Sequence, residues 1–414
     1  MPESSFQYFP IKKGFISKMY PWYLPVVDFI CLLLPGIFLP KRMARFKLER
    51  FFSNQNLLFV DSGKSALVLA LRALEIKQGS EVIVPGFVCP EVVDAILTVG
   101  VTPVFVDINR AFMIDQVDLQ QKITINTACL IITNTYGICD DFEGIKVIAD
   151  KYKFKIINDL AQPFEVIDRG KYRNNFFGDI AIYSFSYTKL FNTTKGGLVI
   201  VRKDSVLKQL DKIVPVERVS YRELFLQHID RISYYLKFKI ISLQQLLPPR
   251  FHLINLPSFV EGNDILNFKK IKPKLMHDRT IISLFIKSFQ YSRYVRLQKA
   301  KIELLNKGIS TIKEITTAHK MESIILYYTI IVPDVRTQLG TYLAEHGYPP
   351  VWNYVPVYYY DAYKKYKTPL IMSEDFSRKV ISIPFRGMSL NKIKKMVMVL
   401  RHFYEIQQLH KEDK

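Results

Sequence analysis

One lysine of this sequence stands where its amine could do covalent chemistry. Lys189 lies in the segment SFSYTKLFNTTKGG, residues 184–197, between two apolar runs that predict strands. A lysine on such a loop can form a Schiff base with a carbonyl compound, and its released amine can carry a proton. Most lysines are solvated surface residues, so this residue alone is weak evidence.

A carboxylate is predicted at the same edge of the structure. Asp159 ends the predicted strand KIIND, residues 155–159, one strand–loop–strand unit before Lys189. A strand-end aspartate is more often a helix cap, so it too gains meaning only from its neighbours.

A third segment could bind phosphate. In DSGKSALVLAL, residues 61–71, a helix opens with Ser62, Gly63, Lys64 and Ser65 directly after the strand LLFV. The free N–H groups and the dipole of a helix start attract phosphate, although either serine could instead be a simple N-cap. A Schiff-base lysine, a carboxylate for a ring nitrogen and a phosphate site together predict the cofactor pyridoxal 5'-phosphate (PLP).

The elements that position these residues follow an alternating pattern. Short apolar runs between residues 57 and 201 predict strands, and the gaps fit helices such as 64–74 and 145–153. This alternation predicts an α/β fold with a mostly parallel sheet covered by helices, whose ligand site lies at the carboxyl ends of the strands. The predicted strands are LLFV (57–60), EVIVP (81–85), PVFVDI (103–108), ACLIITN (128–134), KIIND (155–159), DIAIYSF (179–185) and GLVIV (197–201).

The rest of the chain is more helical. The segment 221–247 is aromatic and basic, and it predicts a long connecting helix or a second membrane-contacting element. Further helices and short strands at 323–332 and 380–384 predict an α+β domain. We therefore expect an arm over 1–52, a PLP-binding large domain over 53–215, a connecting helical region over 216–280 and a small domain over 281–414.

Four motifs, in order and spacing, resemble the DegT-type sugar aminotransferases, which are PLP enzymes of fold type I. They are S-G-K-S-A-L (62–67), G-V-T-P-V-F-V-D (100–107), N-D-L-A-Q (158–162) and S-F-S-Y-T-K (184–189). The resemblance implies that Asp159 holds the pyridine nitrogen, Gln162 the phenolic oxygen, and Ser184 the phosphate. It also implies that Lys189 forms the Schiff base, with Ser62, Gly63, Lys64 and Ser65 around the phosphate.

The sequence departs from the family pattern at four places. The family's G-x-G-G motif after the lysine stands here as Thr194-Lys195-Gly196-Gly197. Lys64 replaces the usual threonine of the phosphate motif. The aromatic residue that stacks on the cofactor falls near Cys89, with Phe87 as the nearest aromatic candidate. The Arg-Asn-His-Gly loop that completes a neighbouring subunit's site has no counterpart after residue 201.

The resemblance implies a transaminase that takes an amino group, from glutamate, to a keto-sugar on a nucleotide or lipid diphosphate, in surface-polysaccharide or glycoconjugate biosynthesis. It also implies a homodimer. A PLP-dependent sugar dehydratase is disfavoured, because His replaces the lysine in such relatives. The alternative of another class is a degenerate PLP-fold protein that binds a partner or membrane without turnover.

The composition of the chain limits the classes of partner that it could bind. The net charge of +20 and the pI near 9.5 imply an anionic partner, which could be nucleic acid, a membrane surface or a phosphate-rich substrate. No helix-turn-helix or aromatic platform supports nucleic-acid binding. Four widely spaced cysteines suggest neither a metal site nor disulfides, so we expect no metal and a reducing, cytoplasmic compartment.

An apolar stretch near the start of the chain could contact a membrane. Residues 24–39 read LPVVDFICLLLPGIFL, and basic residues follow between positions 41 and 50. The stretch is shorter than the roughly 20 residues of a spanning helix and contains prolines, and no cleavable signal peptide is apparent. It could lie peripherally on the cytoplasmic face of a membrane, or pack on the protein or on a second subunit.

Overall fold

The computed structural model describes residues 28, 30–33, 40–52, 56–162, 177–244, 268, 270–317, 325–333, 335–351 and 354–412. Most of the apolar stretch 24–39 lies outside these residues. The described strands are β1 Leu57–Val60, β2 Glu81–Pro85, β3 Thr102–Val106, β4 Thr127–Ile132, β5 Lys155–Asp159, β6 Ile180–Ser184, β7 Gly197–Val201, β8 Tyr328–Ile331 and β9 Val380–Ile383. All seven strands predicted between residues 57 and 201 are confirmed within two residues at either end.

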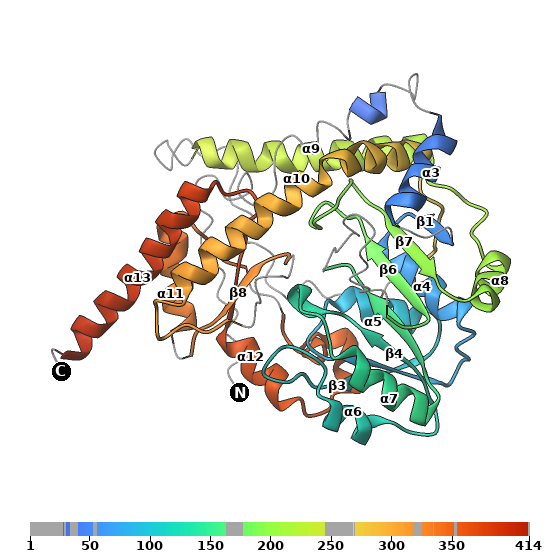
Figure 1. Cartoon of the computed structure of the whole chain (residues 1–414), viewed down its shortest axis with the longest axis horizontal. Helices are drawn as coiled ribbons and strands as arrows, with labels where there is room; N and C mark the ends of the chain where they lie inside the picture. The colour runs from blue at the N-terminus through green and yellow to red at the C-terminus, as the bar shows by residue number, and fades with distance from the viewer. Residues whose placement is uncertain are drawn as a thin grey trace.

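Most of the helices lie between these strands in the order of the sequence, and Figure 1 shows their arrangement. They are α3 Lys41–Phe51, α4 Gly63–Ala73, α5 Pro90–Thr98, α6 Gln116–Lys122, α7 Phe142–Tyr152, α8 Asp204–Lys212, α9 Tyr221–Gln244, α10 Asp278–Ile309, α11 Arg336–Glu345, α12 Ile371–Lys379 and α13 Leu390–Glu412, with the 3-10 helices η1 Thr135–Gly137, η3 Val357–Tyr359 and η4 Asp361–Tyr366.

The large sheet is mostly parallel, as predicted. Its seven strands lie in the order β1-β7-β6-β5-β4-β2-β3, and only β7 runs against its two neighbours. Strand β7 is reversed because the loop that carries Lys189 returns the chain directly beside β6, where Ser184 pairs with Gly197. A loop that leaves and re-enters the sheet at the same edge joins antiparallel neighbours, whereas parallel neighbours need a crossover to the opposite edge.

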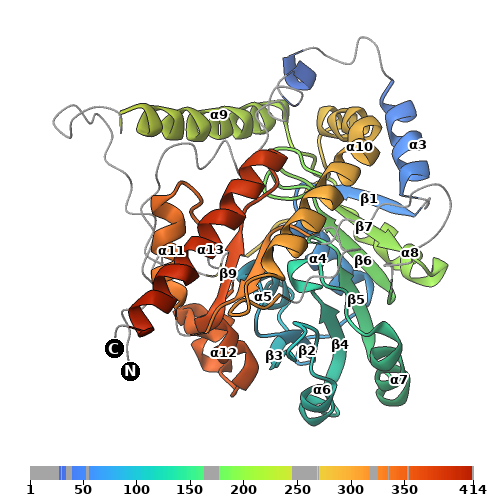
Figure 2. The same cartoon turned by 60° about the vertical axis from the view of Figure 1, so that its left-hand side comes forward.

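Both faces of this sheet are buried over most of its extent, which explains why its strands are rich in consecutive apolar residues. Along β4, Cys129 and Ile131 join one core cluster while Leu130 and Ile132 join another. Successive side chains of a strand point to opposite faces, so each face must be covered by helices. Figures 1 and 2 show helices on both sides of the sheet.

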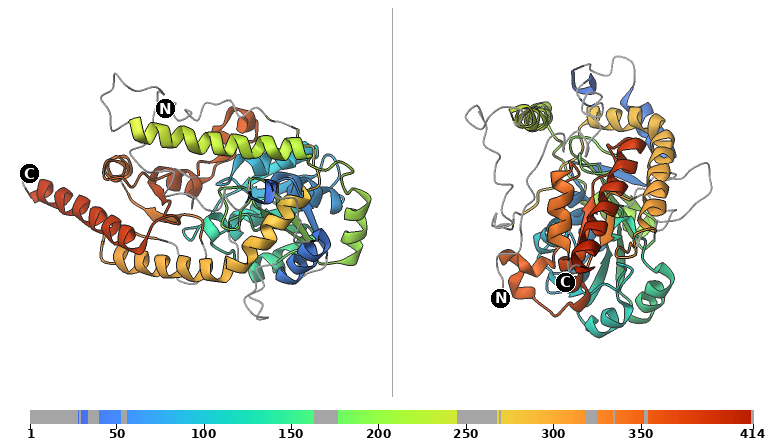
Figure 3. Two further views of the ribbon diagram at one scale, coloured as in Figure 1. Left: turned by 90° about the horizontal axis from the view of Figure 1, so that it is seen from above. Right: turned by 90° about the vertical axis from the view of Figure 1, so that its left-hand side faces the viewer.

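The C-terminal part has its own core. Strands β8 and β9 form an antiparallel pair that packs with α11, α13 and the end of α10. Helix α10 runs from the large sheet to this second core (Figure 3), because Leu284 packs in the former and Leu305 in the latter. The boundary predicted at residue 281 therefore falls inside the first turn of α10, and the four-part division stays a prediction.

The direction of the strands gathers one set of chain segments at one edge. Strands β1, β5 and β6 end at this edge, with Val60, Asp159 and Ser184 as their last residues, and the reversed β7 begins there with Gly197. Ligand sites of open α/β sheets lie at the carboxyl ends of the parallel strands. The residues singled out from the sequence thus come to one side of the sheet.

Candidate functional site

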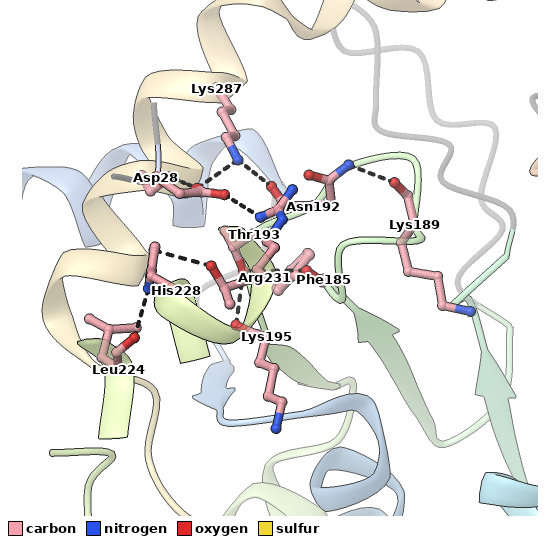
Figure 4. A network of polar contacts seen from close by, with 12 residues as sticks. Asp28, Phe185, Lys189, Asn192, Thr193, Lys195, Leu224, His228, Arg231 and Lys287 are labelled. Atoms are coloured by element: carbon pink, nitrogen blue, oxygen red, sulfur yellow. Dashed lines mark hydrogen bonds and ion pairs between the residues drawn. The ribbon is translucent and has the colours of Figure 1, made fainter. Parts of the chain in front are cut away.

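Lys189 lies on the loop between β6 and β7, and the main chain around it is firmly held. Its N–H donates to the Ser186 carbonyl at 2.9 Å, and its own carbonyl accepts from Asn192 Nδ2 at 2.8 Å. The Arg386 guanidinium donates to the same carbonyl at 2.9 Å and to that of Thr188 at 2.6 Å. The backbone is fixed from two sides, while the side chain points away from these contacts (Figure 4).

Asp159 is a buried carboxylate near the Lys189 ammonium. It is 5% exposed, and its Oδ1 accepts from the Ala161 N–H at 2.8 Å. Burial raises the pKa of the Asp159 carboxyl to about 6, and the Ala161 hydrogen bond and the positive charge of Lys189 both oppose this rise. At neutral pH the residue is therefore an anion in an apolar setting, ready to hold a protonated group.

The predicted phosphate segment and Ser184 meet at a junction of small residues. A Cβ on Gly63 would lie 2.8 Å from Ser184 Cβ, and a Cβ on Gly197 would lie 2.2 Å from the Ser62 carbonyl oxygen. The start of α4, the end of β6 and the start of β7 thus touch through bare backbone. Glycine at both positions permits this close approach, which brings the N-terminus of α4 next to Ser184 and the start of β7.

Within this segment the serines make local contacts. Ser62 caps α4 by accepting from the Ser65 N–H at 3.2 Å, and its hydroxyl donates to Ser65 Oγ at 3.0 Å. The Lys64 ammonium pairs with Glu91 at 2.9 Å on the neighbouring helix α5. Ser62 therefore has the capping role that the sequence left open, and Lys64 has an anionic partner within the protein.

Gln162 bridges two parts of the site. Its Oε1 accepts from the Tyr136 N–H at 2.8 Å, and its Nε2 donates to Tyr354 Oη at 3.3 Å. Tyr136 has a φ of +60° in the turn after β4, a conformation that is uncommon for a large side chain. The bridge helps to hold this strained turn against the segment that follows β5.

Phe87 and Cys89 differ in their burial and in their neighbours. Phe87 has no exposed surface and packs in a core cluster with Phe112 and Tyr136, and its assignment as the residue that stacks on the cofactor stays a prediction. Cys89 is half-buried at the start of α5, and burial raises the pKa of its thiol to about 11. The charges of Lys189 and Asp159 also act on this thiol, which places Cys89 beside the site.

Three contributors were missed from the sequence. Arg386 and Tyr354 come from the C-terminal part, and no local motif marks either of them. The strained turn had a signal, because Asn134 and Gly137 flank it and both types tolerate positive φ. Long-range contacts such as those of Arg386 carry no such signal.

Comparison with known proteins shows what this arrangement is similar to. Residues 42–219 match the DegT/DnrJ/EryC1/StrS aminotransferase family, which confirms the resemblance read from the four motifs. The chain is 38% identical over 149 residues to UDP-N-acetyl-3-dehydro-alpha-D-glucosamine 3-aminotransferase of Acidithiobacillus ferrooxidans, covering 36% of this chain and 40% of that protein. It is 38% identical over 159 residues to GDP-perosamine synthase of Escherichia coli O157:H7, covering 37% and 43%.

The fold is also that of a protein of known structure. The structure of NtdA from Bacillus subtilis with bound cofactor PMP has a TM-score of 0.69 at 21% identity, and the match covers 95% of this chain and 85% of that one. The fold type predicted from the motifs is thereby confirmed. The chain spans about two fifths of the length of the curated relatives it matches.

Proposed function

We propose that this chain, whose residues 42–219 are of the DegT/DnrJ/EryC1/StrS type, is a PLP-dependent aminotransferase. The observation that carries the proposal is the convergence, at one sheet edge, of the Lys189 loop, the buried Asp159 carboxylate and the small-residue junction of Ser62, Gly63 and Ser184. A lysine, an anion and a phosphate cradle are the three groups that such a cofactor needs.

The residues present fit the cofactor. Asp159 would hold a proton at the ring nitrogen, and the junction at Gly63 and Ser184 would offer N–H and hydroxyl groups to the phosphate. Gln162 would face the phenolic oxygen if its Nε2 turned from Tyr354. When bound, PLP supplies a carbonyl for amine exchange and a ring that accepts electrons.

Lys189 would move the proton. Its main chain is fixed by Asn192 and Arg386, so the mobile part is the side chain alone. A fixed anchor with a flexible amine suits an acid–base group that must reach two positions, and such positioned proton transfer contributes about 10²–10⁴-fold to rate. Asp159 would keep its charge at neutral pH, because its pKa of about 6 lies below that range.

We infer that the acceptor is a keto-sugar on a nucleotide or lipid diphosphate, with glutamate as donor. The two curated relatives are named for a UDP-linked amino sugar and for GDP-perosamine. The net charge of +20 is favourable for a diphosphate substrate. A homodimer is part of the same proposal, because PLP enzymes of this fold type build their sites at a subunit interface.

The first experiment tests which lysine binds the cofactor. The full chain is incubated with PLP and reduced with borohydride, and the labelled peptide is mapped. We expect the label on Lys189, loss of label in Lys189→Ala, and none of this loss in Lys195→Ala, which changes an exposed lysine of the same loop. Label on another lysine would contradict the assignment.

Glutamate then separates an enzyme from a degenerate protein. If the chain is a transaminase, adding glutamate converts the cofactor absorbance to that of the pyridoxamine form, and 2-oxoglutarate appears in equal amount. A chain that binds PLP at Lys189 but shows no change with glutamate or other amino donors would be the degenerate PLP-fold protein instead.

We also propose a peripheral membrane contact through the outer face of α3. Met43 and Phe46 are 40% and 55% exposed there, and Arg42, Lys47 and Arg50 lie exposed beside them. Apolar insertion is worth about 25 cal/mol per Å², and each basic residue near anionic lipid adds about 1 kcal/mol. No helix among the described residues is long and apolar enough to cross a membrane.

Vesicle flotation tests this contact with the full chain. We expect binding to anionic vesicles that weakens with salt and with the double change Met43→Ser and Phe46→Ser. The control is Val147→Ser on α7, which removes a 69% exposed apolar side chain from another helix. Equal flotation of all three proteins, or none with any vesicle, would leave α3 without a role at a membrane.

A further inference from the structure

A buried charge cluster lies behind the Lys189 loop. Asp28 is 2% exposed and belongs to the described residues 28 and 30–33, called the N-terminal segment below. Its Oδ1 lies 2.7 Å from Lys287 Nζ on α10, and its Oδ2 lies 2.8 Å from Arg231 Nη1 on α9. Charged groups are buried only at high cost unless they are paired, so these contacts tie together three segments that are distant in the sequence.

The cluster reaches the main chain of Lys189 in two steps. Lys287 Nζ also donates to the Asn192 carbonyl at 2.7 Å, and Asn192 Nδ2 donates to the Lys189 carbonyl at 2.8 Å. Figure 4 shows this path from Asp28 through Lys287 and Asn192 to Lys189. The Lys189 carbonyl is therefore linked to Asp28 through Asn192 and Lys287, and it is held directly by Arg386.

The same loop is held by α9 at a second point. Thr194 Oγ1 lies 3.1 Å from His228 Nε2, and His228 Nδ1 lies 2.7 Å from the Leu224 carbonyl. A carbonyl only accepts, so Nδ1 carries the hydrogen and the neutral ring accepts from Thr194 at Nε2. The seam between the N-terminal segment, α9 and the loop encloses a cavity of only about 10 Å³, room for about one water molecule.

The N-terminal segment is docked by more than its charge. Leu32 is fully buried against Val219 and Leu224, and its carbonyl accepts from the Arg279 guanidinium. Asp28 thus sits on a segment with its own apolar anchor. Loss of the carboxylate would leave Lys287 and Arg231 as two buried cations without their shared anion, which would drive Lys287 away from Asn192.

We propose that Asp28 is a positioning residue for Lys189, so that the candidate site is complete only while the N-terminal segment is docked. The inference rests on the proposed function for its consequence in cofactor binding. The mechanical link itself, from Asp28 to the loop 185–196, can be measured without any cofactor.

The test compares Asp28→Asn with Asp230→Asn, which removes an exposed carboxylate one residue from Arg231. Hydrogen exchange of the cofactor-free chain is followed in peptides covering 185–196. We expect exchange about tenfold faster in Asp28→Asn than in the wild type or Asp230→Asn, the scale of losing one charge-assisted hydrogen bond. Unchanged exchange in this loop would overturn the proposal.

A double variant separates positioning from general stability. Asp28→Asn with Lys287→Met removes an unpaired buried cation, so we expect the melting temperature to recover toward wild type. The link to Asn192 remains broken, so loop exchange should stay fast and PLP binding, by absorbance titration, should stay about tenfold weaker. Recovery of exchange and PLP affinity along with the melting temperature would show a merely structural role. A wild type that binds no PLP would end the proposed function, while the exchange result would still decide this inference.

Discussion

Gly197→Ala probes the junction that brings the candidate phosphate segment to the sheet. Gly197 opens β7, where it pairs with Val60 on one side and Ser184 on the other. An added Cβ would lie 2.2 Å from the Ser62 carbonyl oxygen and 2.8 Å from the Gly63 nitrogen. Both are backbone atoms that cannot rotate away, so β7 or the Ser62–Gly63 peptide must shift.

The size of the shift sets the expected loss of stability. Real Cβ atoms essentially never approach closer than 3.0 Å, so the backbone must move by about 0.8 Å. Overpacking of this kind costs about 1–3 kcal/mol, and alanine returns about 0.4–1 kcal/mol by restricting the unfolded chain. We expect a net loss of about 1.3 kcal/mol and a melting temperature lower by about 3–5 °C.

The neighbouring glycine provides a matched control. A Cβ on Gly196 would lie 2.6 Å from Met276 Cε, the free end of a flexible side chain, and 3.4 Å from Phe185 Cβ. Met276 can turn aside, so Gly196→Ala should melt within about 2 °C of the wild type.

The assays are thermal unfolding and PLP titration of both variants. A misplacement of about 1 Å at a site costs up to about 10²-fold, so Gly197→Ala should bind PLP at least about tenfold more weakly than Gly196→Ala. Equal stability and equal PLP affinity of the two variants would refute the reasoning, because it would mean that the junction tolerates a side chain or lies away from the cofactor.

Three further predictions concern single ionisable groups. Asp159→Asn should lower the rate of the glutamate half-reaction by about 10²-fold or more, because an amide cannot hold the ring proton. The melting temperature should not fall, because an amide is cheaper to bury than a carboxylate. A rate near wild type would count against the assignment. Burial raises the pKa of Asp140 to about 7, above its unfolded value of 3.8, so its contribution to stability is fully present below pH 3.8 and is lost as pH rises through 7. Asp140→Asn should therefore gain stability relative to wild type between pH 5 and pH 8, by a few kcal/mol in denaturant titrations, and a constant difference across that range would contradict this. Lys64→Ala removes a partly exposed pair with Glu91, so it should cost less than about 1 kcal/mol and leave PLP affinity within about threefold, whereas a large loss of affinity would show that Lys64 reaches the phosphate.

The sheet was predictable because its information is local. Each strand from β1 to β7 is an apolar run bounded by turn residues, and burial on both faces makes such runs continuous. The direction of β7 was not predicted, because nothing in GLVIV distinguishes a parallel from an antiparallel neighbour. That direction is set by the loop 185–196, which returns the chain to the edge at which β6 ends.

The residues of the candidate site also divide into those that local sequence predicted and those that it did not. Asp159, Lys189 and the start of α4 were predicted from strand ends and helix starts, and the structure brings their segments to one edge. The position of Phe87 was not foreseen, because an aromatic residue after a strand can turn into the core or toward the site. Its neighbours in the core, Phe112 and Tyr136, come from two other loops.

Several Lys and Arg side chains of this basic chain donate hydrogen bonds to the protein's own main-chain carbonyl groups. A loop between two strands leaves main-chain carbonyls without ladder partners, and buried carbonyls need donors. Arg386 supplies them to Thr188 and Lys189, and Lys287 supplies one to Asn192. Part of the charge of +20 therefore holds the lysine loop rather than attracting an anionic partner. Composition cannot make this distinction, because it depends on which cations the fold buries.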